Sequence, residues 1–170
     1  MAKQGDPVTP SRSPVVLELQ RLDVGSVVAL VGHPIHVMMV HFPIAFVIAT
    51  LGIDVFYWWS GDPFWVRVGL WSAGLTFWTG LAASLAGTGE LLLVPGIRLR
   101  EESWSHAIAA MTLLAIAGAN WGLRLHYPES ILPHGLALSG LASAMAGFAG
   151  WHGGKLVFDH GIGILVSPKD

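Results

Sequence analysis

Four long runs of apolar residues constrain the fold of this chain more than any other feature of its sequence. They cover residues 37–59, 64–86, 104–127 and 131–150, and short turns or loops separate them. A helix needs about 20 residues to cross the hydrocarbon layer of a membrane. Each run reaches that length, so the sequence predicts four transmembrane helices.

The composition also indicates a membrane protein. Apolar residues make up 53% of the chain and charged residues only 12%, whereas soluble domains carry about 25% charged residues. A net charge of −2 offers no basic surface for nucleic acid. The absence of cysteine excludes disulfides, c-type haem attachment and thiolate metal sites. We find no hydrolytic triad, phosphate-binding loop or carboxylate dyad, which favours a redox or accessory subunit over an enzyme.

The predicted fold is all-α: an integral membrane four-helix bundle with up-down-up-down topology, because short loops join helices that pack as antiparallel neighbours. The bundle is expected to occupy residues 32–152. Residues 1–31 form a polar tail with either an interfacial helix or a linker near its end, and residues 153–170 form a Gly-rich tail. Pro43 cannot donate its backbone amide to Met39, so we expect the first helix to begin or bend there.

The distribution of Lys and Arg predicts the orientation, since cytoplasmic loops are enriched in these residues. Arg67 and Arg124 are the basic residues of one side. Both termini are therefore expected in the cytoplasm, together with the larger basic group: Lys3, Arg12, Arg21, Arg98, Arg100, Lys155 and Lys169.

Two polar residues within the apolar runs have simple interpretations. Asn120 is expected to form an interhelical hydrogen bond, and Asp54, near the far end of its helix, to meet water. Tyr57, Trp58 and Trp59 form an aromatic belt at that end.

Histidines are the unusual part of the composition, with eight among few other polar residues. His126 and His134 fall at the periplasmic end, where we expect each to bridge the headgroups and the hydrocarbon or to cap helix carbonyls. Histidines inside membrane segments usually face the bundle interior. Six fall at the predicted cytoplasmic end: His33, His36, His41, His106, His152 and His160.

Two imidazoles from facing helices can hold a haem iron from both sides, and helical bundles build cofactor sites in this way. His41 and His106 lie at matching depth just inside their helices, so we expect them to bind haem b, with His36 and His160 as the next pair. Arg98 and Arg100 could pair with the haem propionates.

Two other readings remain open. One is a non-haem iron or copper site, since histidine suits both metals, with ligands drawn from His33, His36, His41, His106 and His160. The other is a structural subunit of a larger membrane complex, in which the histidines orient loops.

The chain resembles the bacterial domain-of-unknown-function family numbered 2231. The resemblance rests on Gly32-His33-Pro34-Ile35-His36, on Val40-His41-Phe42-Pro43-Ile44, and on the Gly-rich stretch 153–163 with its Asp159-His160 pair. It implies a four-helix protein of the bacterial inner membrane, in a family whose members are sometimes joined to redox domains. We therefore expect a haem-carrying subunit in the lipid bilayer that passes electrons between a redox partner or another membrane subunit and quinone.

Overall fold

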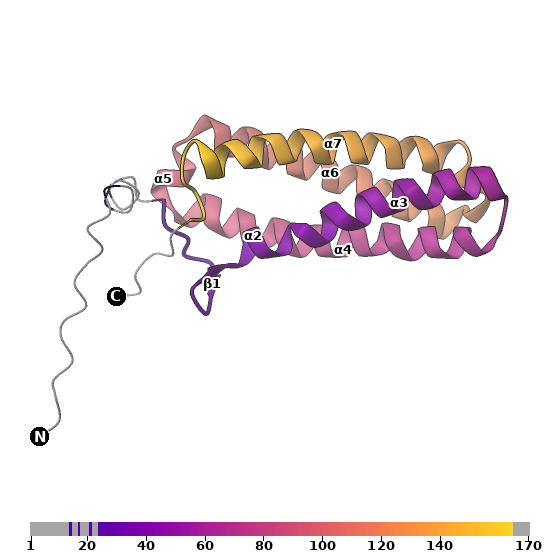
Figure 1. Cartoon of the computed structure of the whole chain (residues 1–170), viewed down its shortest axis with the longest axis horizontal. Helices are drawn as coiled ribbons and strands as arrows, with labels where there is room; N and C mark the ends of the chain where they lie inside the picture. Colours follow the sequence, from indigo (N-terminus) through magenta and orange to yellow (C-terminus); the bar gives the residue numbers. More distant parts are fainter. Residues whose placement is uncertain (1–13, 15–16, 18–20, 22–23, 165–170) are drawn as a thin grey trace, which may run out of the picture.

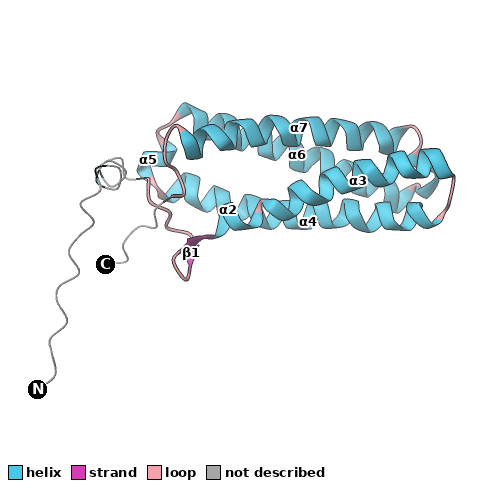
Figure 2. Cartoon of the chain, viewed as in Figure 1, coloured by secondary structure: helices cyan, strands magenta, loops and turns pink. Residues whose placement is uncertain are grey.

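The structure is a computed structural model that describes residues 14, 17, 21 and 24–164. Helices dominate this part of the chain (Figures 1 and 2). Four of them are long: α3 (His41–Ser60), α4 (Phe64–Leu93), α6 (Glu101–His126) and α7 (His134–Phe158). The interfacial helix considered for residues 15–31 is not formed in residues 24–31, which contain β1 (Ala29–Leu30), and residues 15–16, 18–20 and 22–23 lie outside the described part.

The long helices lie side by side (Figure 1). Helix α3 packs against α4 and α7, and α6 packs against the same two helices on the other side. Short connections hold this arrangement. Gly61 ends α3 with a left-handed conformation (φ 66°), and the side chain of Asp62 accepts a hydrogen bond from the backbone N–H of Phe64 (2.9 Å) at the start of α4.

The first apolar run is divided into two helices just before Pro43, one of the outcomes that Pro43 predicts. A five-residue helix, α2 (Ile35–Met39), is separated from α3 by Val40. Because Pro43 has no N–H, the carbonyl of Met39 lacks its helical partner, and the backbone can change direction at this level. Helix α2 can therefore take its position from what it packs on, which is α4.

Two helices extend further than the sequence suggested. We expected the second run to close at residues 87–89, but α4 continues to Leu93 and is followed by the short helix α5 (Pro95–Arg98). We expected the fourth run to end near residue 150, but α7 continues to Phe158. Glycine weakens a helix by only about 1 kcal/mol, and packing against neighbouring helices outweighs that preference here.

Three segments are long and apolar enough to cross a membrane: Ile35–Ser60, Phe64–Leu93 and Glu101–His126. The prediction of transmembrane helices is confirmed to this extent. Helix α7 has the required length but carries many Gly, Ala and Ser residues, and such small side chains add little apolar character.

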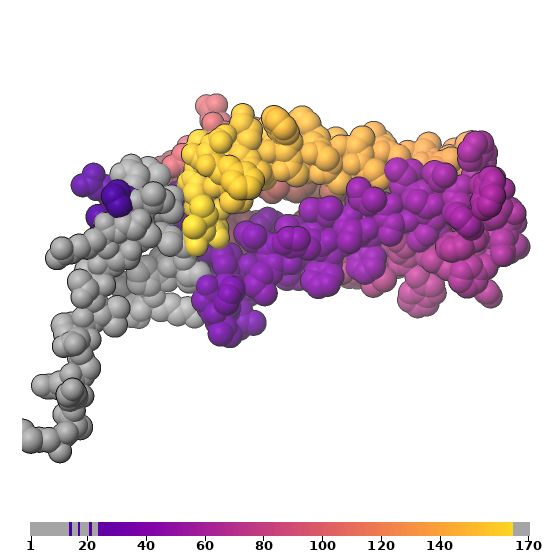
Figure 3. Space-filling view, in the orientation of Figure 1, coloured from indigo at the N-terminus to yellow at the C-terminus, as the bar shows by residue number. Residues whose placement is uncertain are grey.

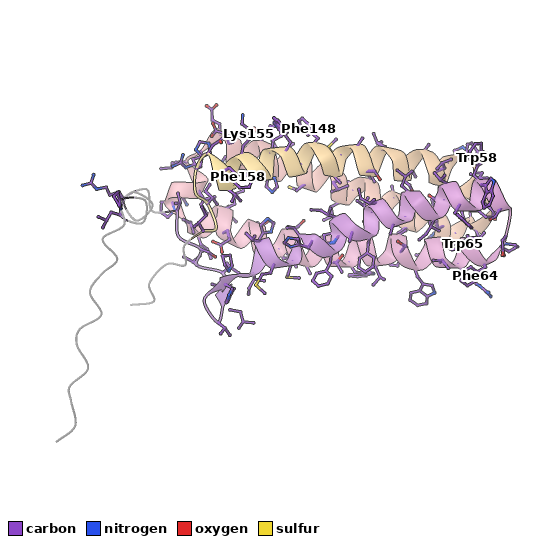
Figure 4. All side chains as sticks on the ribbon, in the orientation of Figure 1. Trp58, Phe64, Trp65, Phe148, Lys155 and Phe158 are labelled. Atoms are coloured by element: carbon purple, nitrogen blue, oxygen red, sulfur yellow. The ribbon has the colours of Figure 1, made fainter. Side chains whose placement is uncertain are left out.

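The large apolar side chains point outward, as in a protein surrounded by lipid. Exposed examples occur on every long helix, among them Trp71, Leu85, Ile108 and Leu141. Figure 4 shows Trp58, Phe64 and Trp65 gathered at the end opposite Lys155 and Phe158. This places the aromatic belt at the α3–α4 turn, with Trp58 and Trp59 largely exposed.

Small and polar residues fill the interior instead. Near the aromatic end, Arg124 of α6 donates from Nη1 and Nη2 to the two carboxylate oxygens of Asp54 on α3 (2.9 and 2.5 Å). Asn120 accepts from Arg124 Nε (2.9 Å) and donates to Ser139 of α7 (2.9 Å). Ser139 in turn donates to Asp54 (2.6 Å).

This buried cluster of Asp54, Asn120, Arg124 and Ser139 corrects two expectations. Asp54 does not meet water, because it is 1% exposed and paired with Arg124, which is 2% exposed. Arg124, expected among the basic residues of the periplasmic side at the end of its helix, is also buried in the interior. Asn120 forms the interhelical hydrogen bond expected of it, to Ser139.

Candidate functional site

Two histidines face each other near the end of the molecule opposite the aromatic belt. His36 comes from α2 and His106 from the second turn of α6. Their ring centroids are 6.2 Å apart, and the ring planes are inclined by 77°. Both side chains are half-buried. Seventy residues separate them in sequence, so only the packing of the helices brings them together.

A backbone carbonyl of a neighbouring helix holds each ring. His36 Nδ1 lies 2.8 Å from the carbonyl oxygen of Ala83 on α4, and His106 Nδ1 lies 3.0 Å from that of Ala149 on α7. A carbonyl can only accept, so Nδ1 carries the proton in both rings. In a neutral imidazole this leaves Nε2 with a free lone pair. Among the described residues neither Nε2 has a hydrogen-bond partner, which leaves both available to a ligand.

Two glycines make these close approaches possible. A Cβ atom at Gly87 of α4 would lie 2.7 Å from Cε1 and Nδ1 of His36, and one at Gly153 of α7 would lie 3.0 Å from Cε1 of His106. Real Cβ contacts are longer than the first distance and rarely as short as the second. The absence of a side chain at these positions therefore allows each ring to reach its carbonyl.

The two rings line a cavity of about 540 Å³ between the helices. Cofactor and drug-sized ligands occupy cavities of about 300–1,000 Å³. In Figure 3 a hollow separates α2 and α3 from the C-terminal part of α7, in the region of this cavity. Most of its lining is apolar, and representative residues are Pro43, Ile44, Leu113, Leu114, Ala117 and Ala146.

A few polar side chains interrupt this lining. Ser103 lies one helical turn before His106; it is 3% exposed, and its hydroxyl has no hydrogen-bond partner among the residues that the structure describes. Buried hydroxyls are nearly always paired, so an unpaired one in a cavity wall is a group suited to a polar atom of a ligand. Glu90 and Ser26 lie in the same wall.

His41, which we expected to face His106, does not do so. Its side chain is exposed, and its Nδ1 lies 3.2 Å from the carbonyl oxygen of Met38 in the same segment. His41 and His36 differ by five positions, which is about 140° around a helix. Only one of them can point into the cavity, and it is His36.

The remaining candidate residues lie outside the cavity. His33 is exposed and bonded to the carbonyl of Val31 (2.8 Å). His160 Nδ1 lies 3.2 Å from Nη1 of Arg100, and Arg98 lies against the carbonyl of Leu92 (3.4 Å). The structure therefore does not bring Arg98 and Arg100, the predicted partners of the haem propionates, to the facing histidines. It also does not gather the five histidines considered as ligands of a non-haem metal. No three His, Asp or Glu side chains within the described residues converge on a point suited to a metal ion.

Sequence reasoning missed Ser103, Gly87 and Gly153. In the sequence Gly87 marked only the close of the second apolar run and Gly153 only the start of the Gly-rich stretch 153–163, and nothing marks Ser103. The histidines assigned to the opposite end do lie apart from the site: His126 is exposed and bonded to the carbonyl of Gly122 (2.9 Å), and His134 is exposed at the start of α7.

Comparisons with known proteins give one match. Neither the curated proteins nor the solved structures contain a match to this chain. A family described as "Predicted membrane protein (DUF2231)" matches residues 32–165, which include α2 with His36, α6 with His106 and the cavity between them. The chain therefore belongs to this family of predicted membrane proteins, as its histidine and glycine motifs indicated.

Proposed function

We propose that this protein is a membrane-anchored b-type haem subunit that transfers electrons, with His36 and His106 as the axial ligands. The observation that carries the proposal is the geometry of the two rings across the cavity. A metal–imidazole bond is about 2 Å long and the ring nitrogen lies about 1.1 Å from the ring centre, so two imidazoles on opposite sides of one ion have centroids about 6.2 Å apart. The ring centroids of His36 and His106 are 6.2 Å apart.

The hydrogen bonds of both rings support the same assignment. Metal-binding histidines generally donate their other ring N–H to a carbonyl or carboxylate, which fixes the tautomer and the ring orientation. His36 and His106 do this through Ala83 and Ala149. Each ring thus keeps Nε2 free, so His36 of α2 and His106 of α6 would be able to hold a haem iron between them.

The cavity supports a large, mostly apolar ligand with a polar edge. Its apolar lining suits a porphyrin, and the unpaired hydroxyl of Ser103 suits a polar substituent. Arg98 and Arg100 lie outside this lining, so we do not retain them as propionate partners. Bound haem supplies one-electron redox chemistry, and its surroundings tune the potential through ligation, hydrogen bonding and burial.

A membrane location is part of the proposal. We propose that α7 crosses the bilayer together with the other long helices, giving an up-down-up-down bundle in a bacterial inner membrane with both termini in the cytoplasm. Helix α7 packs along α3 and α6 and carries exposed Leu141, Phe148 and Trp151. The site would then lie near the cytoplasmic face. There it could accept electrons from a redox partner, and the haem subunit would pass these electrons on to quinone.

The absorption spectrum of the protein, purified in mild detergent after expression with haem supplementation, tests this function. We expect a Soret band and a sharp α band in the reduced form, as six-coordinate low-spin haem gives. His36→Ala and His106→Ala should each remove the low-spin signature, because one axial ligand is lost. His41→Ala and His126→Ala are matched controls and should leave it unchanged.

The opposite results discriminate the alternatives. A colourless protein that contains iron or copper by metal analysis would refute haem and favour a non-haem metal site. A colourless protein without metal would favour a structural subunit. A low-spin spectrum that survives both His36→Ala and His106→Ala would refute the ligand assignment.

A further inference from the structure

The residues before α2 form a compact segment that the end of α4 holds in place. Residues 24–34 contain two short antiparallel strands, β1 (Ala29–Leu30) and β2 (His33–Pro34). The turn between them places Val31 at φ 51° and Gly32 at φ 76°. A β-branched residue rarely adopts a positive φ, and such strain persists only where the surroundings hold the backbone.

Glu90 on α4 is the group that holds this segment. Its carboxylate accepts hydrogen bonds from the backbone N–H of Val27 (3.1 Å) and Val28 (2.9 Å), and from the hydroxyl of Ser26. Glu90 is 8% exposed and Ser26 is 2% exposed. Burying a carboxylate is unfavourable unless it is well paired, and the donors here are all supplied by the segment.

A short chain of bonds connects Glu90 to His36. The backbone N–H of Ile35 donates to the carbonyl of Val28 (3.0 Å), so Val28 is bound to Glu90 on one side and to the first residue of α2 on the other. His36 is the next residue. Gly89 adds to the fit, because a Cβ there would lie 3.2 Å from Cγ2 of Val28.

The junction at Val40 makes this connection important. Val40 keeps a helical conformation and its helical hydrogen bonds to His36 and Ile44, but Pro43 leaves the carbonyl of Met39 without its helical partner, so the join between α2 and α3 is weakened there. The anchors of α2 at its N-terminal side are the Ile35–Val28 bond and the contact of His36 with Ala83.

We propose that Glu90 is a positioning residue that keeps His36 at the level of His106 by binding residues 26–28. This inference rests on the proposed function, since it assigns a role toward the same ligand. Glu90 acts through Val28 and Ile35. Its release would let α2 move along α4, and the imidazole would leave the distance at which both rings reach one metal ion.

The experiment compares Glu90→Ala with Glu90→Gln and Glu101→Ala in the full-length protein. Glutamine retains one acceptor oxygen, which can serve Val28 and Ser26, and loses the oxygen that accepts from Val27, so it should rescue the site in part. Glu101 is an exposed carboxylate in the first turn of α6, so its removal is the matched control. We expect Glu90→Ala to lose the low-spin haem spectrum, Glu90→Gln to keep part of it, and Glu101→Ala to keep it in full.

Hydrogen exchange of the backbone amides provides a readout that does not need haem. In Glu90→Ala the amides of Val27 and Val28 should exchange at least about tenfold faster, because they lose bonds to a charged acceptor, which are among the stronger ones. The amide of Ile35, which donates to the carbonyl of Val28, should also exchange faster because its acceptor is no longer held in place. Amides of the α6–α7 region should be unaffected, which separates local release from general unfolding.

Each outcome decides the question. Faster exchange with loss of the low-spin spectrum, and partial rescue by glutamine, supports the positioning role. Faster exchange with an unchanged spectrum shows that the segment does not position His36, and unchanged exchange shows that Glu90 does not hold it; either result overturns the inference. If the wild-type protein binds no haem, the proposed function fails. Hydrogen exchange at the Ile35 amide still tests the connection from Glu90 through Val28 to Ile35. Loss of protection at Ile35 in Glu90→Ala supports this connection, and unchanged protection in that variant overturns it.

Discussion

The buried pair of Asp54 and Arg124 predicts a strong and non-additive loss of stability. Asp54→Asn removes the negative charge but keeps the size of the side chain. It leaves Arg124 charged at a site where it is 2% exposed. Arg124→Met removes the cation and leaves Asp54 with Ser139 as its donor. Each change breaks the pair and strands one charge in the interior.

The geometry sets the expected size of the effect. The pair is bidentate, with distances of 2.9 and 2.5 Å, and Ser139 satisfies the carboxylate further. Removing one partner of such a buried pair costs about 3–5 kcal/mol. Replacing both partners is often far less unfavourable than the sum, because no charge remains unpaired. We expect the double variant to cost at least about 2 kcal/mol less than the two single variants added together.

Denaturant unfolding in detergent, followed by circular dichroism, measures these free energies for the two single variants and the double variant. Arg67→Met is the control, since Arg67 is exposed on α4 and such changes stay within about 0.5 kcal/mol. Single variants that cost less than about 1 kcal/mol would refute the reasoning. A double variant that costs the simple sum of the singles would refute it as well.

Three further predictions concern the site and the topology. Gly87→Ala should shift or abolish the low-spin haem spectrum, because its Cβ would lie 2.7 Å from the ring of His36, and Gly153→Ala should have a milder effect at 3.0 Å from His106. Gly147→Ala meets no atom within 4 Å and should leave the spectrum unchanged; equal spectra for all three would contradict the close packing. Ser103→Ala should leave the fold intact, since its hydroxyl has no partner within the described part of the chain, but should weaken haem retention in a competition assay with apomyoglobin; unaltered retention would remove Ser103 from the site. Reporter fusions in the α3–α4 turn and in the loop at Glu129 should read periplasmic, and one at the C-terminus cytoplasmic; a cytoplasmic reading in the α3–α4 turn would overturn the orientation.

Much of the architecture follows from local rules that the sequence obeys. The lengths of the apolar runs predict membrane-spanning helices, three of which meet the criteria of length and composition. Pro43 predicts the break before α3, because a missing N–H acts on its own helix whatever the surroundings. Asn120 is mid-helix and must find a partner, so its interhelical bond was also predictable.

The ends of the helices were less predictable, because local preference there is weak. Glycine at positions 87 and 89 favours a helix end by itself, yet α4 continues through both. At Gly87 a helical backbone without a side chain is what allows His36 to reach the carbonyl of Ala83. The same residue type that marks a turn in sequence thus serves here as a packing surface.

The pairing of side chains from different helices could not be read from the sequence. Helical spacing shows that His36 and His41 point in different directions, about 140° apart, but it does not show which direction faces α6. That depends on how each helix is rotated about its own axis. The packing of α2 on α4 sets this rotation, and it selects His36 as the partner of His106. The ion pair of Asp54 and Arg124, which are 70 residues apart, was unpredictable for the same reason. The sequence of each helix does not show which side chain of another helix it will face.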